Sequence, residues 1–191
     1  RGPVGEAGGR GVRAAGEAAN EAGVQVVLDP VGVGATTTRD RVAERLAADL
    51  DLAVVKGNHA EVTALTGADA EVRGVESVGE YADIAATAVA CAREYDAVVV
   101  ASGETDVVAT ADAAYEVRTG DPAMGEVVGT GCMLGATAAT FAGALGDPAE
   151  AALVGTAAFG LAGAAAAEGA VGPVHGARSY TRPFRRAVAG L

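Results

Sequence analysis

A glycine-rich stretch in the last third of the chain carries residue types that could bind a phosphate group. Gly129-Thr130-Gly131-Cys132 comes directly before an Ala-rich run with the composition of a buried helix. Glycines let the backbone turn tightly, so several N–H groups can point outward at the positive end of the helix dipole and form an anion site. A thiol in the first turn, here Cys132, loses its proton more easily. A plain glycine-rich turn before a buried helix is the alternative that these residues alone leave open.

Three further polar segments each follow a run of β-branched residues. The runs at 24–28, 52–55 and 97–101 are predicted to be buried strands. In a parallel sheet, the segments that follow the strands meet at one edge, and ligands bind there. We therefore expect the segments after these strands to gather beside residues 129–132. Their candidate site residues are Asp29, Lys56, Glu61 and Ser102.

Each of these segments also has a purely structural interpretation. Asn58 and Glu61 have the spacing of a capping box, in which the two side chains satisfy backbone N–H groups at the start of a helix. Asp29-Pro30 and Ser102-Gly103 could be ordinary turns after strands. The functional interpretation gains support because the four segments are expected to converge.

Alternating strands and helices predict the fold class. Helices are expected near 6–20, 39–48, 58–65, 81–94, 132–141, 148–167 and 175–191, and a β-hairpin at 107–110 and 114–117. Strands joined by helical crossovers form an α/β fold with a mainly parallel central sheet and helices on both faces. The uncharged run 127–146 has membrane-spanning length, but its Gly/Ala/Thr-rich composition favours a buried helix in a soluble domain.

Composition limits the classes of function. The 191 residues carry a net charge of −11, which argues against a nucleic acid or an anionic membrane as partner. Lys56 is the single lysine. Two cysteines make no disulfide framework, and Cys91 fits a small buried hydrophobe. The opening residues lack the apolar core of a signal peptide, so a cytoplasmic protein is expected. The histidines His59 and His175 lack a partner motif and receive no role.

The order and spacing of four motifs resemble hydroxyethylthiazole kinase, a thiamine-pathway member of the ribokinase-like superfamily. The motifs are Asp29-Pro30-Val31-Gly32-Val33-Gly34-Ala35, Lys56-Gly57-Asn58-x-x-Glu61, Ser102-Gly103-Glu104 and Gly129-Thr130-Gly131-Cys132. The resemblance covers almost the whole chain and implies a ribokinase-like fold. It also implies transfer of the ATP γ-phosphate to the hydroxyl of 4-methyl-5-(2-hydroxyethyl)thiazole, in thiamine biosynthesis or salvage.

The resemblance implies a role for each matching residue. Lys56 and Ser102 match ATP-binding positions, and Lys56 stands where the family usually has arginine. Lysine keeps the charge but lacks the bidentate fork, so its contact should be less directional. Gly129 matches a glycine against the substrate, and Cys132 matches the position of the catalytic base.

The resemblance also implies Mg²⁺ as the cofactor that accompanies ATP. Asp29 and Glu61 match acidic residues that organise the metal and its waters. Hard Mg²⁺ prefers a few carboxylate oxygens and water, so both side chains could bind it directly or through water.

The family's opening segment has no counterpart in residues 1–191, so we expect a single kinase domain that is truncated at its N-terminus. Family members form trimers with active sites between subunits, which predicts a homo-oligomer. Two alternatives remain: another ribokinase-like kinase of a small alcohol, or a catalytically impaired nucleotide-binding remnant. A cysteine hydrolase is disfavoured because neither histidine has a recognisable pairing context.

Overall fold

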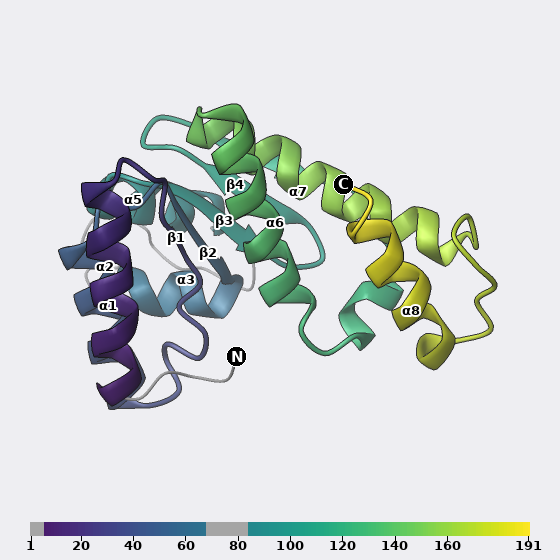
Figure 1. The fold of residues 1–191 in the computed structure, drawn as a ribbon, viewed down its shortest axis with the longest axis horizontal. Coiled ribbons are helices and arrows are strands. Elements are labelled where there is room, and N and C mark those ends of the chain that lie inside the picture. The colour runs from purple at the N-terminus through teal and green to yellow at the C-terminus, as the bar shows by residue number, and fades with distance from the viewer. Residues whose placement is uncertain (1–5, 68–83) are drawn as a thin grey trace.

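Valine-rich segments build the centre of the molecule, a five-stranded sheet with helices on both sides (Figure 1). The computed structural model describes residues 6–67 and 84–191. The strands are β1 (Val27–Leu28), β2 (Val54–Asn58), β3 (Val98–Ser102), β4 (Asp106–Ala109) and β5 (Ala114–Val117). The described helices are α1 (Glu6–Glu21), α2 (Thr37–Asp49), α3 (His59–Thr66), α5 (Ile84–Tyr95), the 3-10 helix η1 (Pro122–Glu126), α6 (Thr130–Leu145), α7 (Pro148–Ala167) and α8 (Ala177–Val188).

The strands lie in the order β1-β2-β3-β4-β5. β1 pairs with β2 and β2 with β3 in parallel, joined by helical crossovers. The pairs β3–β4 and β4–β5 are antiparallel. The short connection from β3 to β4 leaves no room for a crossover, so the chain turns back as a hairpin. The predicted α/β sheet, including the hairpin of β4 and β5, is confirmed.

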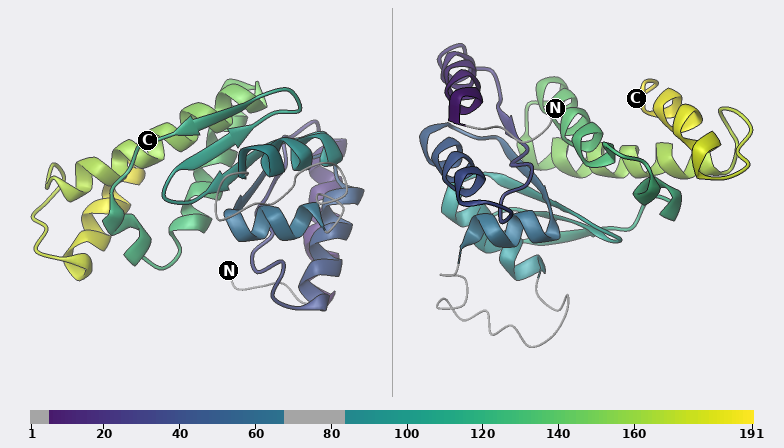
Figure 2. Two further views of the ribbon diagram at one scale, coloured as in Figure 1. Left: turned by 180° about the vertical axis from the view of Figure 1, so that it is seen from behind. Right: turned by 90° about the horizontal axis from the view of Figure 1, so that it is seen from below.

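Alternating valines bury both faces of the sheet. Val55 and Val99 point into a core with α2, α3 and α5, whereas Val54 and Val100 point into a second core with α6, α7 and α8. Figure 2 shows α3 and α5 on one side of the sheet and α6 and α7 on the other. α1 packs on α2, where Gly16 of α1 lies against Leu50 just beyond the end of α2.

Two strands differ in extent from the sequence prediction. β2 continues to Asn58, because residues 54–58 pair in register with residues 98–102 of β3. β1 is only two residues long and pairs with β2 on one side. The start of the helix predicted at 81–94 lies outside the described residues. Because β2 extends to Asn58, Lys56 is a buried strand residue and not part of the loop that was predicted after this strand.

One described helix, α7, is long and apolar enough to cross a membrane. Half of its apolar window is buried in the protein, where it packs on α6, α8 and the sheet. The uncharged run 127–146 forms the 16-residue helix α6 and the loop before it. Both helices therefore have the contacts of core helices.

Candidate active site

The carboxyl ends of β1, β2 and β3 and the start of α6 meet around Lys56. The Lys56 Nζ lies 3.9 Å from Asp29 Oδ1, directly after β1. A methyl group added to Gly131 would lie only 2.9 Å from the same Nζ. The structure thus brings together three of the segments that the sequence predicted to converge.

The Lys56 side chain is only 3% exposed, yet its ammonium retains free donors. The distance to Asp29 exceeds the 2.7–2.9 Å typical of a charge-assisted hydrogen bond. Within residues 6–67 and 84–191 no hydrogen bond from Nζ is present. A buried cation with unused donors is well suited to hold an anionic ligand.

The start of α6 offers backbone donors next to this ammonium. Gly129 has a left-handed backbone (φ +92°), which lets the chain turn into the helix without a side-chain cap. The N–H of Thr130 donates to Val127 O and that of Met133 to Gly129 O. In the described part of the chain, the N–H groups of Gly131 and Cys132 have no acceptor. They point out of the first turn at the positive end of the helix dipole.

Thr130 has a structural contact in place of a free hydroxyl. Its one hydroxyl proton is shared between Val127 O at 2.7 Å and Met124 O at 2.9 Å. These bonds fasten the start of α6 to η1. Within residues 129–132, the predicted anion loop, the unpaired donors are therefore the backbone N–H groups of Gly131 and Cys132.

Asp29 is the acidic partner of Lys56 at this site. Burial raises the pKa of its carboxyl, and the nearby Lys56 charge and a hydrogen bond from the Cys132 thiol only partly oppose that rise. Asp29 Oδ1 is buried and has no hydrogen-bond partner. The exposed thiol of Cys132 lies at the mouth of the same site. The unsatisfied buried oxygen and the unused donors of the ammonium leave hydrogen-bonding capacity for a further polar ligand or for water.

Glu61 connects two of the converging segments. Its Oε1 accepts the N–H of Gly32 at 2.8 Å and its Oε2 accepts the N–H of Asn58 at 2.9 Å. Asn58 Oδ1 accepts the N–H of Glu61 at 2.8 Å, so the capping box considered for these residues is present. Glu61 therefore holds the loop after β1 against the start of α3, whatever else it binds.

Ser102 ends β3 on the other side of the site. Its Oγ donates to Gly57 O at 3.2 Å across the β2–β3 pair. The turn after it is held by Asp106, whose Oδ1 accepts the N–H of Gly103 at 3.0 Å. Burial raises the pKa of Asp106, while this N–H and the His59 and Lys56 charges lower it. The sequence analysis assigned no role to Asp106, and no local turn signal of the usual kind, an Asp followed by a Gly, marks it.

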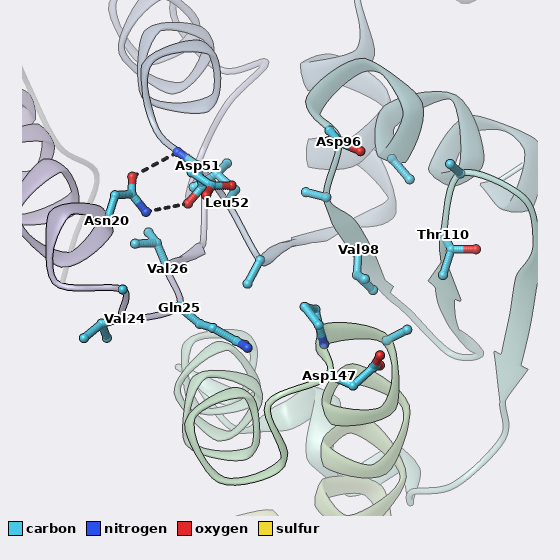
Figure 3. Close-up of a pocket in the computed structure, with 17 residues that line it drawn as sticks. Asn20, Val24, Gln25, Val26, Asp51, Leu52, Asp96, Val98, Thr110 and Asp147 are labelled. Atoms are coloured by element: carbon cyan, nitrogen blue, oxygen red, sulfur yellow. Dashed lines mark hydrogen bonds between the residues drawn. The ribbon is translucent and has the colours of Figure 1, made fainter.

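Two cavities differ in their relation to the site. A cavity of about 290 Å³ borders Asp29 and Cys132, and its other walls come from α1, α2 and β1. A larger cavity of about 470 Å³ lies at the opposite edge of the sheet. Figure 3 shows its acidic side chains, among them Asp51 and Asp147, and the paired hydrogen bonds between Asn20 and Asp51. None of the predicted site residues lines the larger cavity.

A family model matches residues 2–180 of this chain, and its description is the hydroxyethylthiazole kinase family. The chain belongs to the hydroxyethylthiazole kinase family. A hydroxyethylthiazole kinase of Natronomonas pharaonis is 58% identical over 190 residues, covering 100% of this chain and 68% of the relative. A hydroxyethylthiazole kinase of Haloquadratum walsbyi is 59% identical over 144 residues, covering 75% of this chain and 50% of the relative.

A solved structure shares the fold. The hydroxyethylthiazole kinase protein from Pyrococcus horikoshii OT3 superposes with a TM-score of 0.81 at 30% identity. The match covers 100% of this chain and 69% of that one. The predicted membership of the hydroxyethylthiazole kinase family and its kinase character are confirmed by these comparisons.

A hydroxyethylthiazole kinase that uses ATP needs a divalent metal beside the phosphates, and the described residues fit one. Within them no cluster of three or more acidic, histidine or cysteine side chains is present. Mg²⁺ in phosphoryl-transfer sites is commonly held by one or two carboxylates, phosphates and water, so a larger cluster is not required. Asp29, with its unsatisfied Oδ1, is the carboxylate with a free oxygen. Both Glu61 oxygens already accept backbone N–H groups.

Proposed function

We propose that this chain transfers the γ-phosphoryl group of ATP to the hydroxyl of 4-methyl-5-(2-hydroxyethyl)thiazole, as part of thiamine biosynthesis or salvage. The observation that carries the proposal is the buried Lys56 ammonium next to the unpaired N–H groups at the start of α6. Phosphoryl transfer depends mainly on positioning and on neutralising phosphate charge. Donors that are fixed before the reaction supply both.

One set of groups at the site would bind ATP and its metal. Lys56 and the N–H groups of Gly131 and Cys132 would hold the transferring phosphoryl group, and Ser102 would lie near the nucleotide. Asp29 would hold Mg²⁺, with Glu61 acting through water or through the loop that it fastens. The metal, when bound, neutralises phosphate charge and orients the phosphate oxygens.

The thiazole would occupy the cavity beside Asp29 and Cys132. This cavity of about 290 Å³ has apolar walls from residues such as Val42 and Leu46, and polar groups at one end. Such a combination suits a small, mostly apolar ring with one hydroxyl to orient. Gly129, three residues before Cys132, is exposed, and the absence of a side chain there would admit the substrate.

Cys132 would be the base that accepts the hydroxyl proton, as the family resemblance implies, and its removal tests how much that step matters. A positioned base contributes about 10²–10⁴-fold to a rate. The fixed phosphate donors remain in the variant, so we expect Cys132→Ala to lower kcat by about 10²–10⁴-fold without abolishing turnover. Steady-state kinetics with the purified variant measures this. A loss far beyond that range, with the fold intact, would make the thiol indispensable and refute the expectation.

Assembly and location extend the proposal. A homotrimer in the cytoplasm, with active sites between subunits, agrees with the family resemblance. Val128, the residue before the anion loop, is 96% exposed, and a neighbouring subunit would cover this apolar side chain.

The decisive experiment measures ADP release from ATP and Mg²⁺ with and without the hydroxyethylthiazole, at low and high salt. We expect release that depends on the thiazole. No ADP release, while ATP still binds, would overturn the proposal and favour a nucleotide-binding remnant. Release that depends on a different small alcohol would favour another ribokinase-like kinase.

A further inference from the structure

The ends of β2 and β3 place His59 beside the turn that follows Ser102. Asn58, the last residue of β2, pairs in register with Ser102, the last residue of β3. α3 begins at the next residue, His59, and the turn begins at the next residue, Gly103. Two elements that are far apart in the sequence therefore start side by side at the edge of the sheet.

The His59 ring fills the space next to the backbone of this turn. A methyl group added to Gly103 would lie 2.6 Å from both Cε1 and Nε2 of the ring. The ring Nε2 lies 3.2 Å from Thr105 O. Because a carbonyl oxygen only accepts, Nε2 carries the proton of this hydrogen bond. The ring is thus packed on one residue of the turn and bonded to another.

Three contacts from three elements fix the turn. Ser102 Oγ donates to Gly57 O of β2, and Asp106 of β4 accepts the N–H of Gly103. His59 of α3 supplies the third contact, at Thr105. Gly103 and Glu104, between these contacts, are exposed toward solvent. A variant without the His59 ring would lose the hydrogen bond that joins Thr105, at the end of the turn, to α3.

We propose that His59 is a positioning residue for nucleotide binding, which holds the turn 102–105 at the distance from Lys56 that ATP requires. This inference rests on the proposed kinase function. His59 follows Lys56 by three residues. One short segment therefore carries both the ammonium that would bind phosphate and the ring that holds the turn 102–105. The ring acts through the turn and not on the reacting atoms. Its loss should therefore weaken ATP binding and leave the thiazole unaffected.

The test combines His59→Ala, His59→Gln, Gly103→Ala and the double variant His59→Ala/Gly103→Ala. Affinity for ATP is measured directly without thiazole, and KM is measured for each substrate in the coupled reaction. His175→Ala is the matched control, because its side chain is exposed and far along the chain in the segment before α8. Thermal unfolding of every variant reports whether the fold is intact.

We expect His59→Ala to raise Kd and KM for ATP about fivefold, the effect of one lost hydrogen bond. KM for the thiazole should stay unchanged. His59→Gln, which keeps an N–H at similar reach, should recover most of the affinity. Gly103→Ala should weaken ATP binding at least as much, because the added methyl group displaces the ring. In the double variant the two effects should not add, since both break the same contact.

Additive effects in the double variant, or equal changes in the KM of both substrates, would overturn the inference. So would unchanged ATP affinity in both His59→Ala and Gly103→Ala. The wild-type chain is assayed first for ATP binding and thiazole-dependent ADP release. Failure there would overturn the proposed function itself, whereas a normal wild type with unaffected variants would overturn the role of His59 alone.

Discussion

Lys56 and Asp29 form a buried pair that is too widely spaced for a direct hydrogen bond. Burying a charge is costly unless its partner is close and its other hydrogen bonds are satisfied. Here the partners are 3.9 Å apart, and burial raises the pKa of Asp29 despite the Lys56 charge. The sheet and α6 thus hold two buried charged groups that do not fully satisfy each other. Phosphate and metal would relieve both charges at once, which is a physical reason for the site to bind them together.

The close approach of Gly131 to the Lys56 ammonium allows a substitution that should affect activity and not stability. A methyl group at Gly131 would lie 2.9 Å from Nζ, the flexible end of the side chain. Lysine can swing away at little cost, so Gly131→Ala should leave the unfolding midpoint nearly unchanged. The ammonium would leave the phosphoryl site, and losing one such donor costs about 10²–10³-fold in kcat. Thiazole-dependent ADP release and thermal unfolding measure the two effects.

Gly143→Ala is the matched control in the same helix. A methyl group there meets nothing within 4 Å, and alanine in a helix interior is favoured over glycine by about 0.5–1 kcal/mol. Gly143→Ala should be slightly stabilised and fully active. Equal activity of the two variants would show that Lys56 does not act at the start of α6.

Asp106 makes the stability depend on pH. Burial raises its pKa in the folded state above the ordinary value of 3.8. The folded state then binds the proton more tightly than the unfolded state, so stability falls as the pH rises from 3.8 through the raised pKa. Asp106→Asn removes the buried charge and keeps an oxygen that can accept the Gly103 N–H. We expect a higher unfolding midpoint than wild type at pH 7, and a difference that disappears below the ordinary pKa.

Asp112→Asn, in the exposed turn between β4 and β5, is the control for this titration. Because this position is exposed, the substitution should change the midpoint at pH 7 by little. If Asp106→Asn is less stable than wild type at neutral pH, the carboxylate contributes more through its hydrogen bond than its burial costs.

At the scale of elements, the sequence predicted types and order better than ends. The strand predicted at 52–55 continues to Asn58, because backbone pairing with β3 decides where a strand stops, and a side-chain pattern does not report that pairing. The capping box of Asn58 and Glu61 was predictable because its geometry is local. The contact of His59 with Gly103 depends on the register of β2 and β3, and no local signal encodes it.

Helix α7 packs closely against Thr119, in the segment that leads to residues 129–132. A methyl group on Gly160 would overlap Thr119 Oγ1 and lie 2.7 Å from the Thr119 backbone carbon. Because a backbone atom cannot move aside, Gly160→Ala should lower the free energy of unfolding by about 1–3 kcal/mol. Gly155→Ala in the same helix meets only ordinary contacts with Phe141 at 3.4 Å and should be close to wild type. Chemical denaturation measures both, and equal stability would mean that residues 118–121 adjust freely.

At the scale of the whole molecule, the positive groups of the site have the opposite sign to the net charge of the chain. The chain carries 25 acidic residues against 14 basic ones, a net charge of −11 that repels an anionic nucleotide from afar. The attraction that ATP would experience is local, from Lys56 and the start of α6. Buried charges are screened by salt much less than exposed ones. Salt should therefore weaken the long-range repulsion more than the local attraction.

Raising the salt concentration should stabilise the fold and improve ATP binding together. Between about 0.01 M and 1 M salt the Debye length falls from about 30 Å to about 3 Å, which screens the repulsion among exposed carboxylates. We expect the unfolding midpoint to rise and the KM for ATP to fall over this range. Glu44→Gln and Glu94→Gln, on exposed positions of α2 and α5, should each reduce the dependence of the midpoint on salt. A midpoint that falls with salt would show that attractive ion pairs, such as Arg13 with Glu17 and Asp49, outweigh the net repulsion.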